Sequence, residues 1–178
     1  MGGKEIPNTL YNRLMYIVEE RPMVEMCEQG DLEGVRWALE KIRYKVGSVE
    51  HGGVPNFGTS DSMFHTALMF AVQNQYNSVV KFLLTEPDFC FTNEANTLTG
   101  DTALHCACQE DNSCALSLLV HHPSKPDINT KNSRGETPLM VAVKCGSINS
   151  VRCLVGLPGV NMETTDAEGR DLLEIARY

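Results

Sequence analysis

The sequence lacks a long apolar run, a secretory leader and a glycosylation sequon. No stretch approaches the roughly 18 consecutive apolar residues that a membrane-spanning helix needs. Residues 1–6 contain neither an apolar run nor a cleavage site, and no Asn-x-Ser/Thr triplet occurs. The seven cysteines have no regular spacing, which is unlike a disulfide framework. These absences predict a soluble, unanchored protein in a reducing compartment, the cytoplasm or the nucleus.

Basic residues are also scarce. The 178 residues include 15 Lys and Arg against 23 Asp and Glu, which gives a formal charge of −8. This balance argues against direct binding to nucleic-acid phosphates and favours a basic or neutral protein partner. Because 42% of the residues are hydrophobic, the chain can still bury a sizeable core.

Catalytic and cofactor motifs are missing as well. The chain has no Gly-rich phosphate loop, no Gly-x-Ser-x-Gly elbow and no His-Glu-x-x-His. Its acidic residues are scattered rather than paired, although folding could still bring distant residues together into a site. We therefore expect neither enzymatic activity nor a cofactor.

What the chain does contain is a repeated motif. The hexapeptide Thr66-Ala67-Leu68-Met69-Phe70-Ala71 superposes without gaps on residues 102–107 and 137–142, and residues 171–176 form a degenerate fourth copy. These copies start 36, 35 and 34 residues apart. Each of the first three is followed by an apolar stripe at helical spacing, in residues 79–84, 115–120 and 150–155. The pattern predicts a pair of helices in each repeat.

The turn between the two helices falls at Gln75, Asp111 and Gly146. Glycine suits a left-handed residue at a helix end and Asp tolerates that conformation, whereas Gln adopts it poorly. The repeat that contains Gln75 is therefore expected to turn differently.

A second kind of turn is predicted at the tip before the first helix. In three copies an Asx or Thr precedes Gly by three residues, which predicts a turn capped by the Asx or Thr side chain. The pairs are Thr97 with Gly100, Asn132 with Gly135, and Asp166 with Gly169.

The amino-terminal part fits the same frame. Pro22 stands near the start of a helix and Gly30 at its end. About a dozen extra residues then precede the next copy, and residues 47–60 have the composition of a long, exposed loop. The predicted organisation is an N-terminal capping helix (1–20), repeat 1 with the inserted loop (21–60), repeat 2 (61–96), repeat 3 (97–131), repeat 4 (132–165), and a partial repeat 5 or C-terminal cap (166–178).

These copies resemble the ankyrin-repeat family. The consensus of that family runs Asp-x-x-Gly-x-Thr-Pro-Leu-His-x-Ala, followed by a turn and a Val-Val-x-Leu-Leu-Leu helix. The resemblance covers residues 21–178. It implies an all-α repeat solenoid of about four ankyrin repeats plus a terminal half repeat, in which helix pairs carry projecting β-hairpin or turn tips.

The resemblance also implies where a partner binds. Contacts in this family come from tip residues and from exposed residues of the first helices, which together form the concave face. Carried over copy by copy, these positions are Met63, His65, Gln73, Asn74, Leu98, Thr99, Asp101, Gln109, Glu110, Ser133, Arg134, Glu136, Lys144, Cys145, Ala167, Glu168 and Arg170. The face mixes apolar and polar groups, as interaction surfaces often do.

A cluster of cysteine and histidine raises the alternative of a zinc site, because thiolate and imidazole are preferred zinc ligands. Its members are His105, Cys106, Cys108, Cys114, His121 and His122. In the repeat frame, however, Cys108 takes the small, buried place of a first helix and His105 takes the structural His place. Packing is therefore favoured over metal binding, and no metal site is predicted.

The leading functional interpretation is a non-catalytic protein–protein interaction module, an adaptor, scaffold or inhibitor, that binds a protein partner through the concave face. The second is a targeting ankyrin segment of a larger multidomain protein whose activity lies outside this chain, because residues 171–178 supply a first helix with no second helix to cover it. A metal-dependent or enzymatic role is third. We expect a monomer that contacts neither nucleic acid nor membrane directly.

Overall fold

The computed structural model describes residues 23–38, 67–85 and 93–177. The predicted capping helix in residues 1–20, the inserted loop at 47–60, and the site residues Met63 and His65 lie outside these residues. Within them, the regular elements are α-helices, accompanied by one isolated antiparallel bridge between Ala95 and Thr102.

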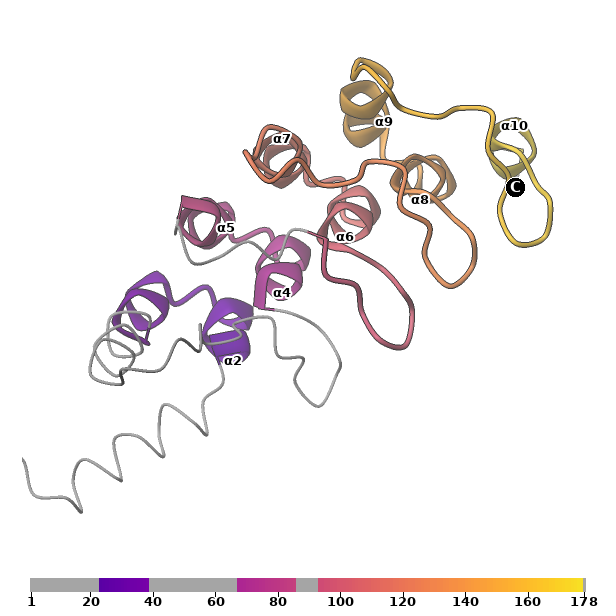
Figure 1. Ribbon diagram of the computed structural model, residues 1–178. Coiled ribbons are helices and arrows are strands. Elements are labelled where there is room, and N and C mark those ends of the chain that lie inside the picture. Colours follow the sequence, from indigo (N-terminus) through magenta and orange to yellow (C-terminus); the bar gives the residue numbers. More distant parts are fainter. Residues whose placement is uncertain (1–22, 39–66, 86–92, 178) are drawn as a thin grey trace, which may run out of the picture.

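The helices form two rows, and the helices of each row follow one another along the stack (Figure 1). One row holds the first helices of the repeats: α2 (Met23–Glu28), α4 (Ala67–Gln73), α6 (Ala103–Gln109), α8 (Pro138–Cys145) and α10 (Leu172–Ile175). The other row holds the second helices: the helical residues 32–38, α5 (Asn77–Thr85), α7 (Ser113–Val120) and α9 (Ile148–Val155). This arrangement confirms the predicted all-α repeat solenoid. No helix in the described residues is long and apolar enough to span a membrane.

Local sequence signals fix where the helices begin. The side chain of Thr137 accepts a hydrogen bond from the Met140 backbone N–H, and Pro138 follows at the first helical position of α8. Asn112 caps α7 in the same way by accepting from Ala115 N–H. Such caps satisfy backbone donors that have no partner inside the helix.

The turn between the two helices has the same backbone in three repeats. Gln75, Asp111 and Gly146 all have positive φ, at 59°, 47° and 69°. The residue after each of them donates its N–H to the fifth residue before it, always an alanine, at 2.9 Å. The prediction that the repeat of Gln75 turns differently is wrong. Shared packing of the helix pair imposes the left-handed residue there in spite of its side chain.

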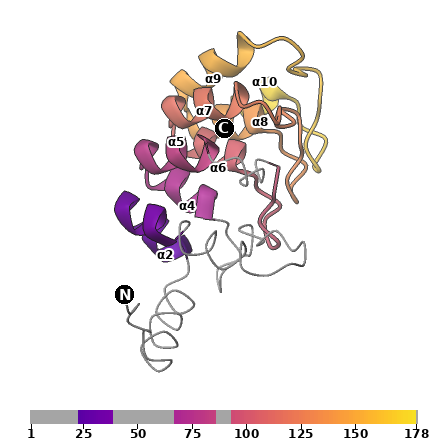
Figure 2. The ribbon, with the colours of Figure 1, turned by 60° about the vertical axis from the view of Figure 1, so that its left-hand side comes forward.

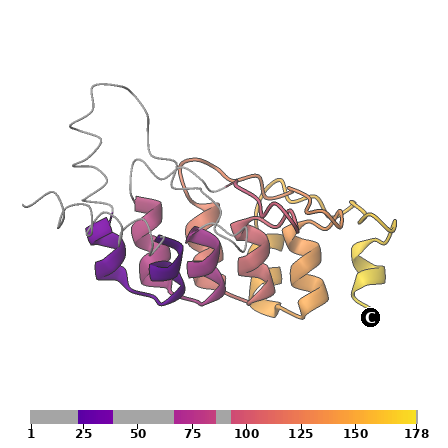
Figure 3. The same ribbon diagram turned by 90° about the horizontal axis from the view of Figure 1, so that it is seen from below.

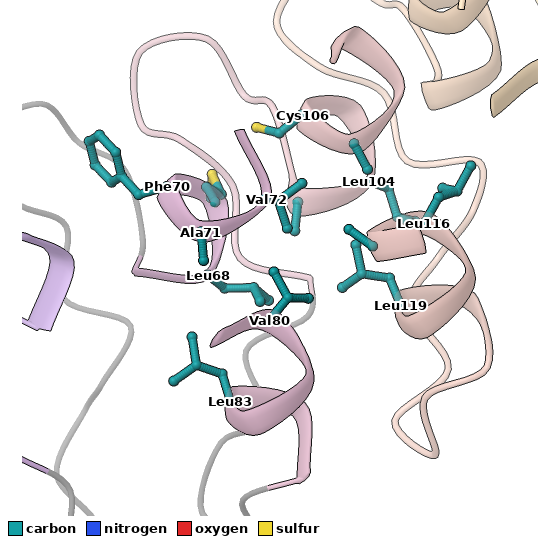
Figure 4. Close-up of a cluster of buried hydrophobic side chains, with 14 of the residues drawn as sticks. Leu68, Phe70, Ala71, Val72, Val80, Leu83, Leu104, Cys106, Leu116 and Leu119 are labelled. Atoms are coloured by element: carbon teal, nitrogen blue, oxygen red, sulfur yellow. The ribbon is translucent and has the colours of Figure 1, made fainter. Parts of the chain in front are cut away.

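Successive repeats are joined by a continuous apolar core. Leu68 and Val72 of α4, Leu83 of α5, Leu104 of α6 and Leu116 of α7 are buried and gather between the two rows (Figure 4). Ala71, Ala107 and Ala142 are fully buried as well, and their small side chains allow neighbouring helices to approach. The repeated residues of the sequence are therefore the scaffold, as predicted.

Candidate functional site

The tips are turns capped by Asx side chains. In the last two tips, Asn132 Oδ1 accepts from the backbone N–H groups of Arg134 and Glu136, and Asp166 Oδ1 accepts from those of Glu168 and Arg170. Gly100, Gly135 and Gly169 all have positive φ, which confirms their predicted place in the turns.

One predicted cap is wrong. In the tip before α6, the capping oxygen belongs to Asn96, which accepts from Leu98 and Thr99 N–H, and not to Thr97. This tip is one residue longer than the others, so the Asx side chain precedes Gly100 by four residues instead of three. The side-chain amide oxygen of Asn96 reaches both backbone donors from that position.

Neighbouring tips are bonded to each other. Ser133 N–H donates to the Thr99 carbonyl at 2.9 Å, and Ala167 N–H donates to the Arg134 carbonyl at 2.9 Å. The tips contact so closely that a Cβ on Gly135 would lie 2.5 Å from Ala167 N. They project from the same end of the helix pairs (Figures 2 and 3). We call the surface formed by these tips and the first helices the tip face.

Most of the predicted partner-binding residues in the described part of the chain are exposed or partly exposed. The exposed ones are Asn74, Leu98, Gln109, Ser133, Arg134, Lys144, Cys145, Ala167 and Glu168. The partly exposed ones are Gln73, Thr99, Asp101, Glu110 and Arg170. Leu98 is the largest apolar exposure among them, with 68% of its surface accessible.

Glu136 departs from the expected exposed position, because its side chain is only 1% accessible. Its carboxylate accepts hydrogen bonds from Arg134 Nε at 2.6 Å, Lys144 Nζ at 2.6 Å and Asn132 Nδ2 at 3.2 Å. Burial alone would raise the pKa of Glu136. The bonds from Lys144, Arg134 and Asn132 outweigh burial and hold the pKa below its usual value. A buried anion thus anchors two cations of the tip face.

The last tip contains a similar ion pair with a different arrangement. Arg170 donates from Nε and Nη2 to Asp166 Oδ2, at 2.8 and 2.7 Å, and from Nη1 to Glu168 Oε2 at 3.1 Å. Here one cation is shared between two carboxylates, and its bonds help to hold the pKa of Asp166 below its usual value despite the opposing effect of burial.

Part of the cysteine and histidine cluster is scaffold. Cys106, Cys108 and His105 are buried in the row of first helices. The His105 ring accepts at Nδ1 from Thr102 N–H, at 3.1 Å, so its Nε2 carries the proton and donates to the Glu136 carbonyl at 3.0 Å. Burial lowers the pKa of His105, which favours this neutral form. The structural place predicted for His105 and Cys108 is confirmed. In the described part of the chain, no three His, Cys, Asp or Glu side chains are placed to hold a metal ion.

Sequence reasoning missed several side chains that join neighbouring repeats. Asp111 accepts from Ser150 N–H at 2.8 Å, Asn112 Nδ2 donates to the Val72 carbonyl at 3.1 Å, and a ring nitrogen of His122 lies 2.9 Å from the Leu84 carbonyl oxygen. Local sequence patterns place Asp111 in the turn between the helices and His122 in the cysteine–histidine cluster, and they give Asn112 no role. Their inter-repeat bonds depend on the stacking distance, which no local pattern encodes.

Comparison with known proteins decides the family. A family model described as ankyrin repeats, in three copies, matches residues 68–166, which is more than half of the 178 residues. The chain belongs to the ankyrin-repeat family. Ankyrin repeats are generally protein–protein interaction modules, and proteins of this family are typically non-catalytic.

Two relatives resemble parts of this ankyrin chain. A UPF0507 protein of Yarrowia lipolytica is 33% identical over 79 residues, which cover 44% of this chain and 7% of the relative. The nuclear factor NF-kappa-B p110 subunit of Drosophila melanogaster is 40% identical over 65 residues, which cover 36% of this chain and 6% of the relative. The matched stretches therefore span less than a tenth of these curated relatives.

Proposed function

We propose that this chain is a non-catalytic module, an adaptor, scaffold or inhibitor, that binds a protein partner on the tip face, which corresponds to the concave face of the family. The observation that carries this proposal is the bonding of successive tips, Thr99 to Ser133 and Arg134 to Ala167. Because the tips are joined, exposed side chains of several repeats lie along one surface, and a partner can contact them together.

The composition of the tip face supports the same proposal. It combines an apolar side chain, Leu98, with the cations Arg134 and Lys144 and with polar groups such as Gln109. Arginine and large apolar residues are the types that contribute most to protein interfaces when they are desolvated.

Binding by variants of the full chain tests the surface. A partner is isolated from native lysate and purified, and its affinity is measured for the wild type, for Leu98→Ala combined with Arg134→Ala, and for Arg152→Glu. The double variant should weaken binding by roughly 30-fold or more, since loss of an anchor costs at least about 2 kcal/mol. Arg152 is exposed on α9, in the row of second helices, so its substitution should leave the affinity unchanged.

The opposite ranking would place the binding surface elsewhere. If Arg152→Glu abolished binding while the double variant bound as well as the wild type, the partner would contact the row of second helices. Thermal melts of each variant are needed beside the affinities, because a loss of folding would imitate a loss of binding.

A second proposal is that the chain acts as a targeting ankyrin segment within a larger protein. It is supported by the lengths of the two relatives, of which the matched stretches cover 7% and 6%. The sequence of the full-length gene on both sides of this segment tests it. Flanking sequence with a catalytic or other binding domain would support the targeting role, whereas its absence would leave the module as the whole functional unit.

We further propose a reducing, intracellular location, in the cytoplasm or the nucleus. The described cysteines are all free thiols, and Cys27, Cys106 and Cys108 are buried in the core, where they act as small apolar residues.

We also propose that the module is a monomer without direct contact to nucleic acid or membrane. Light scattering of the purified chain measures its molar mass and so tests whether it is a monomer.

A further inference from the structure

Two cations of the tip face share one buried anion. Arg134 from the tip and Lys144 from the last turn of α8 both bond to Glu136, each at 2.6 Å. The Glu136 side chain is 1% accessible, whereas those of Arg134 and Lys144 are 52% and 48% accessible. The negative charge is therefore enclosed, and the positive groups face outward.

Both cations keep donors that the described part of the chain does not use. Arg134 bonds to Glu136 through Nε, and its two terminal nitrogens have no hydrogen-bond partner among residues 23–38, 67–85 and 93–177. Lys144 uses one of its three N–H donors on Glu136. Because Glu136 already orients both side chains, an acidic group could bind them at a small additional cost in side-chain entropy.

The neighbouring tips show that this arrangement is particular to one repeat. Arg170 in the last tip is occupied by Asp166 and Glu168 through three of its nitrogens. The preceding tip carries the exposed Leu98 and the carboxylate of Asp101, and Asp101 Oδ1 accepts from Asn132 Nδ2 at 2.8 Å. Asp101 also acts electrostatically on Arg134. Arg134 and Lys144 thus each use a single nitrogen on Glu136, whereas Arg170 uses all three nitrogens of its guanidinium group.

We propose that Arg134 and Lys144 together bind the carboxylate of an Asp or Glu in the partner, and that Leu98 contacts an apolar residue beside it. This inference rests on the proposed function. The bond from Ser133 to Thr99 places Leu98 and Arg134 one residue away on either side of the contact between their tips. Because Leu98 and Arg134 flank this contact, we expect a short peptide with an acidic residue next to an apolar one to contact both side chains.

The formal charge of −8 does not oppose this local preference. At physiological ionic strength, exposed charges are largely screened beyond about 8 Å. The net charge therefore has little effect on a group in direct contact, where Arg134 and Lys144 set the preference for an anion. A carboxylate can form charge-assisted hydrogen bonds with both cations, which are stronger than neutral ones.

A phage-displayed library of random peptides, selected on the full 178-residue chain, supplies the probe. The recovered peptides should be enriched in Asp or Glu beside an apolar residue. The affinity of the strongest peptide is then measured by fluorescence polarisation for the wild type, Arg134→Gln, Lys144→Gln and Arg152→Gln. Each of the first two substitutions should weaken binding by roughly tenfold or more. Arg152→Gln removes the same charge from α9 and should change the affinity less than about twofold.

Replacing the peptide's acidic residue by its amide isolates the contact. With the wild-type chain, this peptide change should weaken binding as much as Arg134→Gln does. With the Arg134→Gln variant it should weaken binding much less, because the peptide carboxylate and Arg134 interact. Thermal melts accompany each variant. If Arg134→Gln fails to fold, Lys144→Gln carries the test with the same peptide pair.

Several outcomes would overturn the inference. The first is that no selected peptide needs an acidic residue to bind. The second is that Lys144→Gln and Arg152→Gln weaken peptide binding equally. The third is that the peptide change and the protein change lower the binding free energy by strictly additive amounts. The proposed function would still stand if peptides of another composition bind and Leu98→Ala weakens their binding. The proposed function would also be wrong if peptide binding depends on Arg152 and not on the tip face.

Discussion

At the scale of single residues, two glycines with similar backbones have different surroundings. Gly135 and Gly169 have φ of 72° and 80°. A Cβ at Gly135 would lie 2.5 Å from Ala167 N, whereas nothing lies within 4 Å of a Cβ at Gly169. Both alanine variants should lose about 1–2 kcal/mol from the left-handed backbone. Gly135→Ala should lose about 1–3 kcal/mol more, because the neighbouring tip has to move.

Urea melts of Gly135→Ala and Gly169→Ala measure this difference with matched chemistry. Equal free energies of unfolding for the two variants would show that the tips are not in firm contact.

Glu136 gives the tip face a dependence on pH. Its pKa is lowered in the folded chain, so the ionised form stabilises the fold fully above about pH 4.5, the usual value for Glu. This contribution is lost as the pH falls through the lower, folded value. At pH 7, Glu136→Gln should cost about 1.5–3 kcal/mol, the typical worth of hydrogen bonds to a charged group.

The measurement is a series of urea melts of wild type and Glu136→Gln between pH 7 and pH 3. The difference between the two proteins should be constant down to about pH 4.5 and should shrink below it. Other carboxylates titrate in both proteins, so their effects cancel. A difference that stays the same at every pH would mean that the charge of Glu136 does not stabilise the fold.

Residue types predicted the tip glycines but not the partners of Glu136. The spacing of Asn132 and Gly135 is a local signal, and it predicts the turn correctly. The ion pair of Glu136 with Lys144 joins a tip residue to a residue eight positions later in α8, and no short pattern marks that pair. For the same reason, Arg134→Ala, which the sequence treats as a surface change, should cost more than the roughly 0.5 kcal/mol usual for exposed residues.

At the scale of elements, the turn after α4 holds a left-handed Gln75, with φ of 59°. Its side chain makes one long bond, 3.3 Å, to the Glu110 carbonyl. Glycine at this position would relieve about 1–2 kcal/mol of backbone strain in the folded protein. It would also lower the stability by about 0.5–1 kcal/mol, because the unfolded chain gains conformational entropy. We expect Gln75→Gly to stabilise the protein by about 0.5 kcal/mol in urea melts.

Lys81, an exposed residue inside α5, supplies the control. Lys81→Gly should destabilise the chain by roughly 1 kcal/mol, because glycine weakens a helix interior. If both substitutions destabilised the protein equally, the turn at Gln75 would not be strained.

The sequence predicted the helices better than the turns between them. Apolar spacing marks both helices of each repeat directly, and Leu104 and Leu116 are buried as that spacing requires. The turn geometry follows from how the two helices pack, which overrides the conformational preference of Gln75. A propensity argument for one residue therefore failed where the pair of helices decides the backbone.

At the scale of the whole molecule, the repeated period was enough to predict the solenoid, because each repeat packs on its neighbours in the same way. The α6 helix packs on α4, α7 and α8, and its Leu104 is 1% accessible. The chemistry of the partner could not be read from the period, since the residues that repeat are those that are buried. It depends on residues such as Leu98 and Arg134, which differ from one repeat to the next.

The same dependence on neighbours predicts where the stack opens first. The α10 helix packs on α8, and it buries Ile175 while Leu173 remains 70% accessible. With less contact to hold it, α10 should open without disturbing the other repeats. Amide hydrogens of residues 172–177 should exchange at least about tenfold faster than those of 104–108, which equals about 1.4 kcal/mol in opening free energy. Hydrogen exchange followed by mass spectrometry measures both segments in one sample. Equal protection of the two would mean that the contact of α10 with α8 is as strong as the contacts inside the stack, and the exposed Leu173 would then need another explanation.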